Sequence, residues 1–171
     1  MVNHADYSNI TGLTKEETLK HILDSYETLK TSNWVTNLSN LSSLLWHGYH
    51  SIGVQVNWTG FYVKNHDSQN QEEQLILGPF QGKVACQFIN FGSGVCGNCA
   101  STKTTQLVPN VEEYPGHIAC DGETKSEIVV PILSGGEVWG VIDLDCLTLE
   151  GFNEIDQKYL EELAELISKS L

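Results

Sequence analysis

Apolar residues recur at helical spacing at both ends of the chain. Thr14 and Glu17 form a capping box, and the apolar residues that follow them share one helical face. A second amphipathic helix is predicted over about 33–47, and Asn153, three residues before Asp156, caps a helix near the C terminus. Each helix has one apolar side, so each is expected to pack on a shared core.

Between these helices, the pattern changes to one that is typical of strands. A short helix is predicted to begin near Val95, and Gly135-Gly136 is predicted to turn the last two strands into a hairpin. Helices that bracket hairpin-linked strands favour an α+β fold, in which helices cover an antiparallel sheet. The apolar runs predict strands over 53–63, 75–77, 83–89, 105–108, 126–133 and 138–146.

The 171 residues are interpreted as one domain, because no repeat, low-complexity tract or linker divides them. With 40% hydrophobic residues, a chain of this length can bury a core without disulfide staples. Residues 1–12 precede the first helix signal and are predicted to be a flexible N-terminal extension.

Charge excludes several classes of partner. The chain has 9 Lys and no Arg against 22 Asp plus Glu, which gives a net charge of −13. Phosphate backbones and anionic membranes repel such a chain, so we expect no nucleic-acid or membrane partner. The sequence shows no secretory signal and no membrane-spanning segment, which predicts a cytoplasmic protein that could also enter the nucleus. Its cysteines are then thiols at rest.

The five cysteines differ in their surroundings. Cys96 follows a Gly-Ser-Gly loop at the start of the short helix, where the helix dipole should stabilise a thiolate. Cys120 precedes Asp121 in a loop without apolar periodicity. Cys86 is predicted to lie mid-strand, where burial as a small hydrophobe and a redox role are equally open. Cys146 ends a strand on an apolar face and is predicted to be buried.

Two chemistries fit these cysteines. Cys96-x-x-Cys99 and His117-x-x-Cys120 have the form of a Cys₃His zinc site, although a domain with its own core does not need a structural metal. Thiol redox chemistry instead needs an activated thiolate and a second thiol within reach. Cys96 with Cys120 suits the predicted loops better than the nearby Cys96–Cys99 pair, so redox chemistry is favoured.

Carboxyl groups are expected to gather on one face of the sheet. Strand alternation places Asp143 and Asp145 on the same face, and Glu127 begins the partner strand. A two-residue glycine turn would pair Glu127 with Leu144, whereas a three-residue loop would pair it with Asp145. The sequence leaves both registers open. Convergence of the three acids would raise at least one pKa and provide a proton donor at neutral pH.

Two aromatic residues follow on another predicted strand. Trp58 and Tyr62 flank Gly60 with the period of a strand face. They are either core residues or an aromatic wall that contacts a methyl or methylsulfinyl group, with Gly60 letting the ligand approach.

These motifs together resemble the free methionine-R-sulfoxide reductases, enzymes built on a GAF domain. The resemblance covers the chain from about residue 19 to 166. It implies a six-stranded antiparallel sheet with the terminal helices packed together, and a homodimer. It is densest in NWTGFYV (57–63), LGPFQGKVAC (77–86), GVCG (94–97), YPGHIACDGETKSEIVVP (114–131) and GVIDLD (140–145).

The resemblance also implies the site. It places the aromatic pair around the substrate methyl group and the three acids around the sulfoxide and the ammonium, and so favours the converging register. Cys96–Cys120 is the expected disulfide, and Cys99 departs from the family pattern as a bystander or secondary thiol. The implied redox residues are Cys86, Cys96 and Cys120, and the implied substrate-binding residues are Trp58, Tyr62, Glu127, Asp143 and Asp145.

The implied mechanism is thiol attack on the sulfoxide sulfur while a carboxyl group protonates the oxygen. The sulfenic acid then condenses with a second cysteine, and thioredoxin with NADPH acts as the external reductant, without a bound cofactor or metal. Cys120 is the expected nucleophile, with Cys96 as its rival because its helix-terminal position favours a thiolate. Because the chain has no Arg, backbone N–H groups near 116–121 are expected to hold the substrate carboxylate.

The alternative function is a GAF-type module that senses a small ligand or redox state without turnover. Such a sensor needs an output domain, and the sequence shows none, which favours the enzyme. A pocket rich in carboxylates also suits an ammonium ligand better than a cyclic nucleotide.

Overall fold

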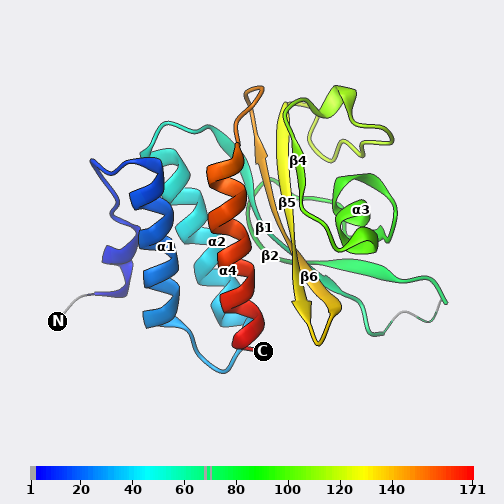
Figure 1. Cartoon of the computed structure of the whole chain (residues 1–171), viewed down its shortest axis with the longest axis horizontal. Coiled ribbons are helices and arrows are strands. Elements are labelled where there is room, and N and C mark those ends of the chain that lie inside the picture. The colour runs from blue at the N-terminus through cyan, green and yellow to red at the C-terminus, as the bar shows by residue number, and fades with distance from the viewer. Residues whose placement is uncertain (1–2, 68, 70) are drawn as a thin grey trace.

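The computed structural model describes residues 3–67, 69 and 71–171, and its core is one six-stranded sheet (Figure 1). The strands are β1 (Val56–Lys64), β2 (Gln74–Gly82), β3 (Phe88–Asn90), β4 (Gln106–Val108), β5 (Ser126–Ser134) and β6 (Glu137–Cys146). They pair in the order β3-β2-β1-β6-β5-β4, and every pairing is antiparallel. The predicted α+β fold with an antiparallel sheet is confirmed.

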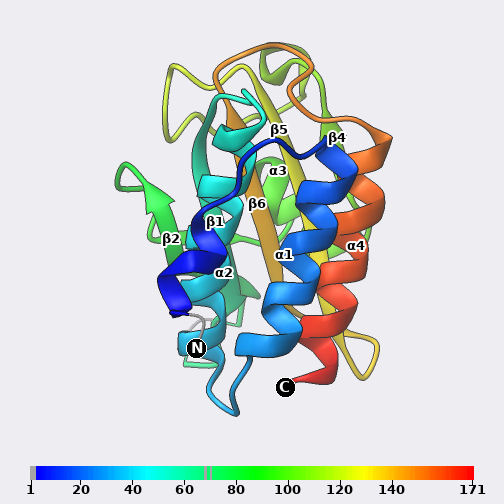
Figure 2. The ribbon, with the colours of Figure 1, turned by 90° about the vertical axis from the view of Figure 1, so that its left-hand side faces the viewer.

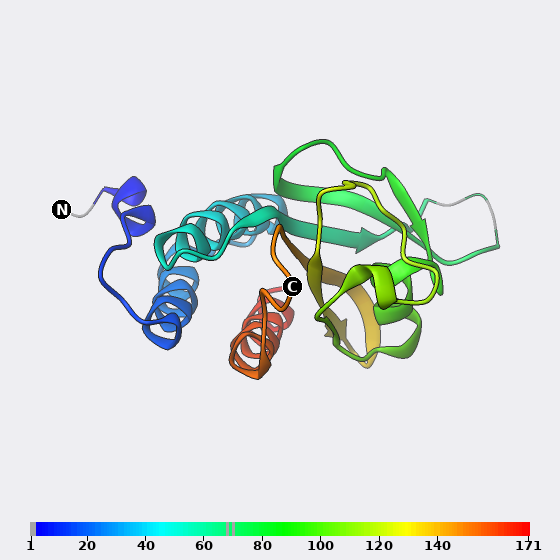
Figure 3. The ribbon, with the colours of Figure 1, turned by 90° about the horizontal axis from the view of Figure 1, so that it is seen from above.

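The long helices α2 (Trp34–Ser51) and α4 (Glu154–Lys169) cover one face of the sheet, and α1 (Lys15–Leu29) packs on these two helices (Figure 3). α1 contacts both α2 and α4, so helices from the two ends of the chain lie side by side, as predicted (Figure 2). The short helix α3 (Gly94–Thr102) lies on the opposite face. None of the helices in the described part of the chain is long and apolar enough to cross a membrane.

The helices begin where the local sequence predicts. The Thr14 hydroxyl accepts a hydrogen bond from the Glu17 backbone N–H, and the Glu17 carboxylate accepts one from the Thr14 N–H. At α4, the Asn153 side chain accepts from the Ile155 N–H, and the Asp156 carboxylate accepts from the Asn153 N–H. These reciprocal bonds satisfy N–H groups that a helix end otherwise leaves without partners.

Asp156 also joins the three long helices. Its carboxylate is fully buried and accepts hydrogen bonds from Lys15 Nζ of α1 and from the Tyr49 hydroxyl of α2, both at 2.8 Å. The Asn153 N–H completes the set at 2.7 Å. A buried charge is stable when it is paired and hydrogen-bonded in this way.

Alternate residues of β6 point to opposite sides of the sheet. Ile142, Leu144 and Cys146 belong to the apolar core between the sheet and the long helices. Val141 packs with residues of α3 on the other side, and Asp143 lines a pocket there. One strand therefore serves both the core and the candidate site, because strand side chains alternate with a period of two.

The β5–β6 hairpin combines the two registers that the sequence left open. Ser134 pairs with Glu137 across a two-residue glycine turn, and a bulge then inserts Trp139 as an extra residue in β6. Beyond the bulge, Glu127 pairs with Asp145. The turn is the two-residue form, but the pairing at the acids is the one that a three-residue loop would give.

The predicted strand over 83–89 is wrong in its first part. The residues before β3 form a loop, so Cys86 lies in a loop rather than in mid-strand. The backbone carbonyls of Lys83 and Cys86 accept side-chain hydrogen bonds from β1 instead of taking part in a strand ladder. The apolar alternation in this segment is therefore misleading.

The N-terminal segment contains local structure. Residues 1–2 lie outside the described part of the chain, and His4–Ser8 form a 3₁₀ helix, η1. Ile10 is buried, and Tyr7 packs against the helical core. The flexibility predicted for residues 1–12 stays a prediction.

Candidate active site

The candidate site is a pocket on the face of the sheet opposite the long helices. It contains about 610 Å³ of empty space, a volume that includes the open solvent at its mouth. Its floor comes from β1, β5 and β6, and its walls come from the start of α3 and the loops around 83–85 and 117–124. Seven of the eight predicted site residues line it: Trp58, Tyr62, Cys96, Cys120, Glu127, Asp143 and Asp145.

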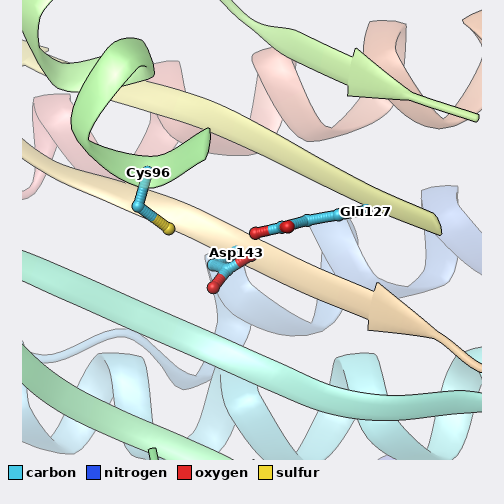
Figure 4. A group of neighbouring side chains, drawn as sticks. All are labelled: Cys96, Glu127 and Asp143. Carbon is cyan, nitrogen blue, oxygen red and sulfur yellow. The ribbon is translucent and has the colours of Figure 1, made fainter. Parts of the chain in front are cut away.

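The carboxyl groups converge on the pocket floor. Glu127 of β5 lies opposite Asp145 of β6, and both Glu127 and Asp143 are about 5% exposed. Figure 4 shows the carboxyl groups of Glu127 and Asp143 close to the thiol of Cys96, which projects from α3. One donor atom of each of these three side chains lies within 4.8 Å of the other two.

Burial and mutual repulsion raise the pKa of all three acids. For Glu127, burial has the largest effect and the charge of Asp145 adds to it. The pKa of Asp143 is raised by burial, by the charge of Glu127 and by a hydrogen bond to it. The pKa of Asp145 is raised by burial and then by Asp143. A carboxyl group with a raised pKa keeps its proton to a higher pH, so these acids can act as proton donors.

Some of these buried carboxyl oxygens have no partner. Asp143 Oδ1 and Asp145 Oδ1 are buried and make no hydrogen bond, although their residues line the pocket. Buried polar atoms are nearly always hydrogen-bonded, so atoms left unpaired in a pocket indicate a place for a ligand. The ligand that suits them is a hydrogen-bond donor or a cation.

Cys96 differs from the prediction made for it. It lies in the first turn of α3, where the helix dipole was expected to lower its pKa. Burial raises the pKa of the Cys96 thiol instead, and the charges of Asp143 and Glu127 raise it further. Desolvation and two nearby carboxyl groups outweigh a dipole that is worth about 1 kcal/mol, so Cys96 is a protonated thiol in this state.

The disulfide joins Cys86 to Cys120, and the expected Cys96–Cys120 pairing is wrong for this structure. The loop around Cys86 lies beside the mouth of the pocket, whereas Cys96 is buried among the acids. The alternative Cys₃His zinc arrangement is not formed, because Cys120 is in the disulfide and the Cys99 thiol donates to Val129 O. Cys99 and Cys146 are both buried, and the burial of Cys146 confirms its prediction.

The aromatic pair lines the pocket and also supports a loop. The Trp58 and Tyr62 rings stack with centroids 5.7 Å apart. Trp58 Nε1 donates to Lys83 O at 3.2 Å, and the Tyr62 hydroxyl donates to Cys86 O at 2.9 Å. Both aromatic side chains therefore fix the loop that carries Cys86.

Gly60 has a different role from the one predicted. A side chain at this position would approach Phe80 Cβ to within 2.4 Å and Pro79 O to within 2.8 Å on neighbouring β2. The glycine makes room for β2, and the Phe80 ring then stacks on Trp58 at 5.1 Å. Close packing between strands, rather than approach of a ligand, explains this glycine.

Two pocket residues were not predicted in the positions they occupy. His117 Nε2 lies 3.5 Å from Glu127 Oε2, and burial lowers the pKa of His117. Asn57 donates to Asp121 at 3.2 Å and to Thr124 at 2.9 Å, which holds the loop after Cys120 against β1. Both lie in motifs that the sequence analysis singled out, but the contacts bridge distant segments and leave no local signal.

Comparison with known proteins agrees with this architecture. Residues 40–171 match the model of the GAF domain family. The free methionine-R-sulfoxide reductase of Saccharomyces cerevisiae is 61% identical over 98% of this chain and 94% of its own length. A solved structure of a GAF domain superposes with a TM-score of 0.94 at 61% identity, covering 99% of this chain and 96% of that one.

A solved structure of the Neisseria meningitidis free methionine-R-sulfoxide reductase, in complex with its substrate, has a TM-score of 0.84 and 37% identity. It covers 94% of this chain and 92% of its own. The similarity therefore includes the sheet, the helices and the pocket walls. The chain belongs to the GAF domain family and, within it, to the free methionine-R-sulfoxide reductases.

Proposed function

We propose that this chain reduces free L-methionine (R)-sulfoxide to L-methionine and takes its electrons from thioredoxin. The observation that supports this most directly is a disulfide at the mouth of a pocket whose floor carries buried carboxyl groups with raised pKa values. Thiols that can form a disulfide supply two electrons, and a buried carboxyl group supplies a proton. The named activities of the relatives agree with this chemistry.

The pocket offers complementary surfaces for each part of the substrate. The buried acids suit the ammonium group, which would supply the positive charge that they lack. The stacked Trp58 and Tyr62 rings suit the methyl group. With no Arg in the chain, backbone N–H groups of the 116–121 loop are proposed to hold the carboxylate.

The proposed reaction begins with a thiolate at Cys120, which is exposed and lines the pocket. The thiolate attacks the sulfoxide sulfur, and a carboxyl group on the floor, foremost Asp143, protonates the oxygen. The oxygen is transferred to Cys120 as a sulfenic acid, and methionine leaves with its sulfur reduced. The Cys120 sulfur loses two electrons, and the substrate sulfur gains them.

Cys86 is proposed as the second cysteine, in place of the role first given to Cys96. Its thiol condenses with the sulfenic acid of Cys120, which forms the disulfide and releases the oxygen as water. The dithiol of thioredoxin then reduces this disulfide by thiol–disulfide exchange. The supporting observation is that Cys86 and Cys120 are bonded whereas Cys96 is a free, buried thiol.

We further propose a cytoplasmic homodimer that needs no bound cofactor. Size-exclusion chromatography with light scattering would measure the number of subunits, and a monomer would reject the dimer.

The test is turnover of the two separated epimers of free methionine sulfoxide with thioredoxin, thioredoxin reductase and NADPH. NADPH consumption is expected with the R epimer alone and is expected to vanish in Cys120→Ser. Cys86→Ser should release one equivalent of methionine and then stop with thioredoxin, because the sulfenic acid has no partner. Cys99→Ser is the matched control and should keep normal turnover. No turnover with either epimer by folded, reduced protein would reject the proposal.

A further inference from the structure

One buried thiol takes no part in the proposed redox cycle. Cys96 is about 5% exposed, is not in the disulfide, and points toward two buried carboxyl groups (Figure 4). Its sulfur lies within 4.8 Å of a carboxyl oxygen of Asp143 and of one of Glu127. Sulfur and two carboxylate oxygens from three different elements thus meet at one point on the pocket floor.

The charge at this point is poorly compensated. Among the described residues that line the pocket, the basic ones are Lys83 and His117. Lys83 is paired with Glu123 on the surface at 3.3 Å, and His117 lies against Glu127 at 3.5 Å with a lowered pKa. Asp143 Oδ1 is buried without a partner. A group of donors with an unsatisfied oxygen and a deficit of positive charge favours a cation.

We infer that Cys96, Glu127 and Asp143 form a binding site for a thiophilic divalent cation, of which Zn²⁺ is the type, and that such a cation blocks the pocket. Three protein ligands leave a fourth tetrahedral position for water. With metal–sulfur and metal–oxygen bonds of about 2.3 and 2.0 Å, tetrahedral donors lie roughly 3.5 Å apart. The observed upper limit of 4.8 Å therefore requires a closure of at most about 1.3 Å, within reach of side-chain rotation.

The sulfur ligand decides which cations bind. Thiolate favours zinc and similar borderline metals, whereas Mg²⁺ and Ca²⁺ prefer all-oxygen sites and several waters. Binding to the thiolate releases the thiol proton of Cys96. Affinity should therefore fall about tenfold for each unit of decreasing pH when one proton is released.

Inhibition follows from position, and this part rests on the proposed function. The same acids are proposed to bind the substrate ammonium, so the metal and the substrate exclude each other. The site is inhibitory rather than catalytic, since the redox chemistry uses Cys86 and Cys120 and needs no metal.

Cobalt absorption tests the site without measuring activity. Protein with its Cys86–Cys120 disulfide intact is titrated with Co²⁺, so that these two cysteines cannot be ligands. A thiolate-to-cobalt charge-transfer band is expected at one equivalent, with no effect of excess Mg²⁺. Cys96→Ser should abolish the band and weaken binding at least about 100-fold. Cys99→Ser, which changes the other thiol of α3, should keep the band.

Asp143→Asn provides a second test if Cys96→Ser fails to fold, and it should weaken Co²⁺ binding with the band still present. Absence of the band, or an equal band in folded Cys96→Ser, would overturn the inference. Saturating methionine-R-sulfoxide should raise the apparent Kd for Co²⁺ at least about tenfold by competition. A band that the substrate does not weaken would retain the metal site and reject its overlap with the substrate.

Discussion

Two buried aspartates on opposite sides of the sheet differ in what surrounds them. Asp156, against the long helices, accepts hydrogen bonds from Lys15, Tyr49 and Asn153. Asp143, on the pocket floor, has one oxygen without a partner and lies beside the carboxyl group of Glu127. The Asp156 carboxylate has its partners within the protein, whereas Asp143 needs a ligand. The number of satisfied oxygens, rather than burial, separates the structural acid from the reactive one.

Asp143→Asn should cause the largest effect on the pocket side. Loss of the proton donor should lower kcat/KM for methionine-R-sulfoxide about 100- to 1000-fold. The free energy of unfolding should stay constant or rise, because an amide cannot take on the charge that burial and Glu127 disfavour at this position. Coupled NADPH assays and urea denaturation measure the two quantities. Normal turnover in a destabilised variant would make Asp143 a structural residue.

Asp156→Asn is the matched change on the helical side. It should lower the free energy of unfolding by about 3 kcal/mol, because Lys15 and Tyr49 lose a buried charged acceptor. Below its unfolding midpoint, the variant should keep its kcat/KM. A loss of activity at full folding would contradict the separation of the two sides.

The pocket acids should make stability depend on pH. The folded-state pKa values of Glu127, Asp143 and Asp145 are raised above the ordinary carboxyl value near 4. Above that pH the folded state binds more protons than the unfolded state, so stability falls as pH rises, by about 1.4 kcal/mol per unit for each retained proton. Denaturation across about pH 5 to 8 measures the slope. An equal slope in Asp143→Asn would exclude this residue as the source.

Tyr62→Phe should have the smallest effect and concerns the loop rather than the floor. It removes the hydrogen bond to Cys86 O, worth about 1 kcal/mol, and keeps the ring. Closure of the Cys86–Cys120 disulfide should slow about fivefold, as measured by quenched single turnover. Tyr49→Phe also loses one buried hydroxyl and serves as the control: it should lower stability and leave closure unchanged. Equal slowing in both variants would reject a specific role for Tyr62.

Local chemistry made much of the fold predictable. Cap residues such as Thr14 and Asn153 act within one helical turn, so their sequence signals suffice. The alternation that placed Asp143 and Asp145 on one face acts within a single strand. The shared face of Asp143 and Asp145 was thus predictable from the strand alone, whereas their meeting with Glu127 depends on the bulge at Trp139.

The features that could not be predicted depend on contacts between distant segments. The bulged Trp139 packs edge-on against Trp34 at the start of α2, with ring centroids 5.4 Å apart. The position of Cys86 depends on hydrogen bonds from β1 to its loop. The high pKa of Cys96 arises from acids on two other elements. The effect of a helix dipole can be predicted from one segment of the sequence. The effect of a buried cluster cannot, because its members come from several segments.

The Cys86–Cys120 disulfide spans 34 residues of sequence, including β3, α3 and β4. In the chain-entropy description, closing a loop of this length disfavours the unfolded chain by about 4 kcal/mol. Each catalytic cycle would therefore close and reopen a covalent loop that contains most of the wall of the pocket. The oxidised enzyme then has a higher free energy of unfolding than the reduced enzyme. When reductant is scarce, the enzyme would accumulate in this more stable oxidised form and would become active again once the disulfide is reduced.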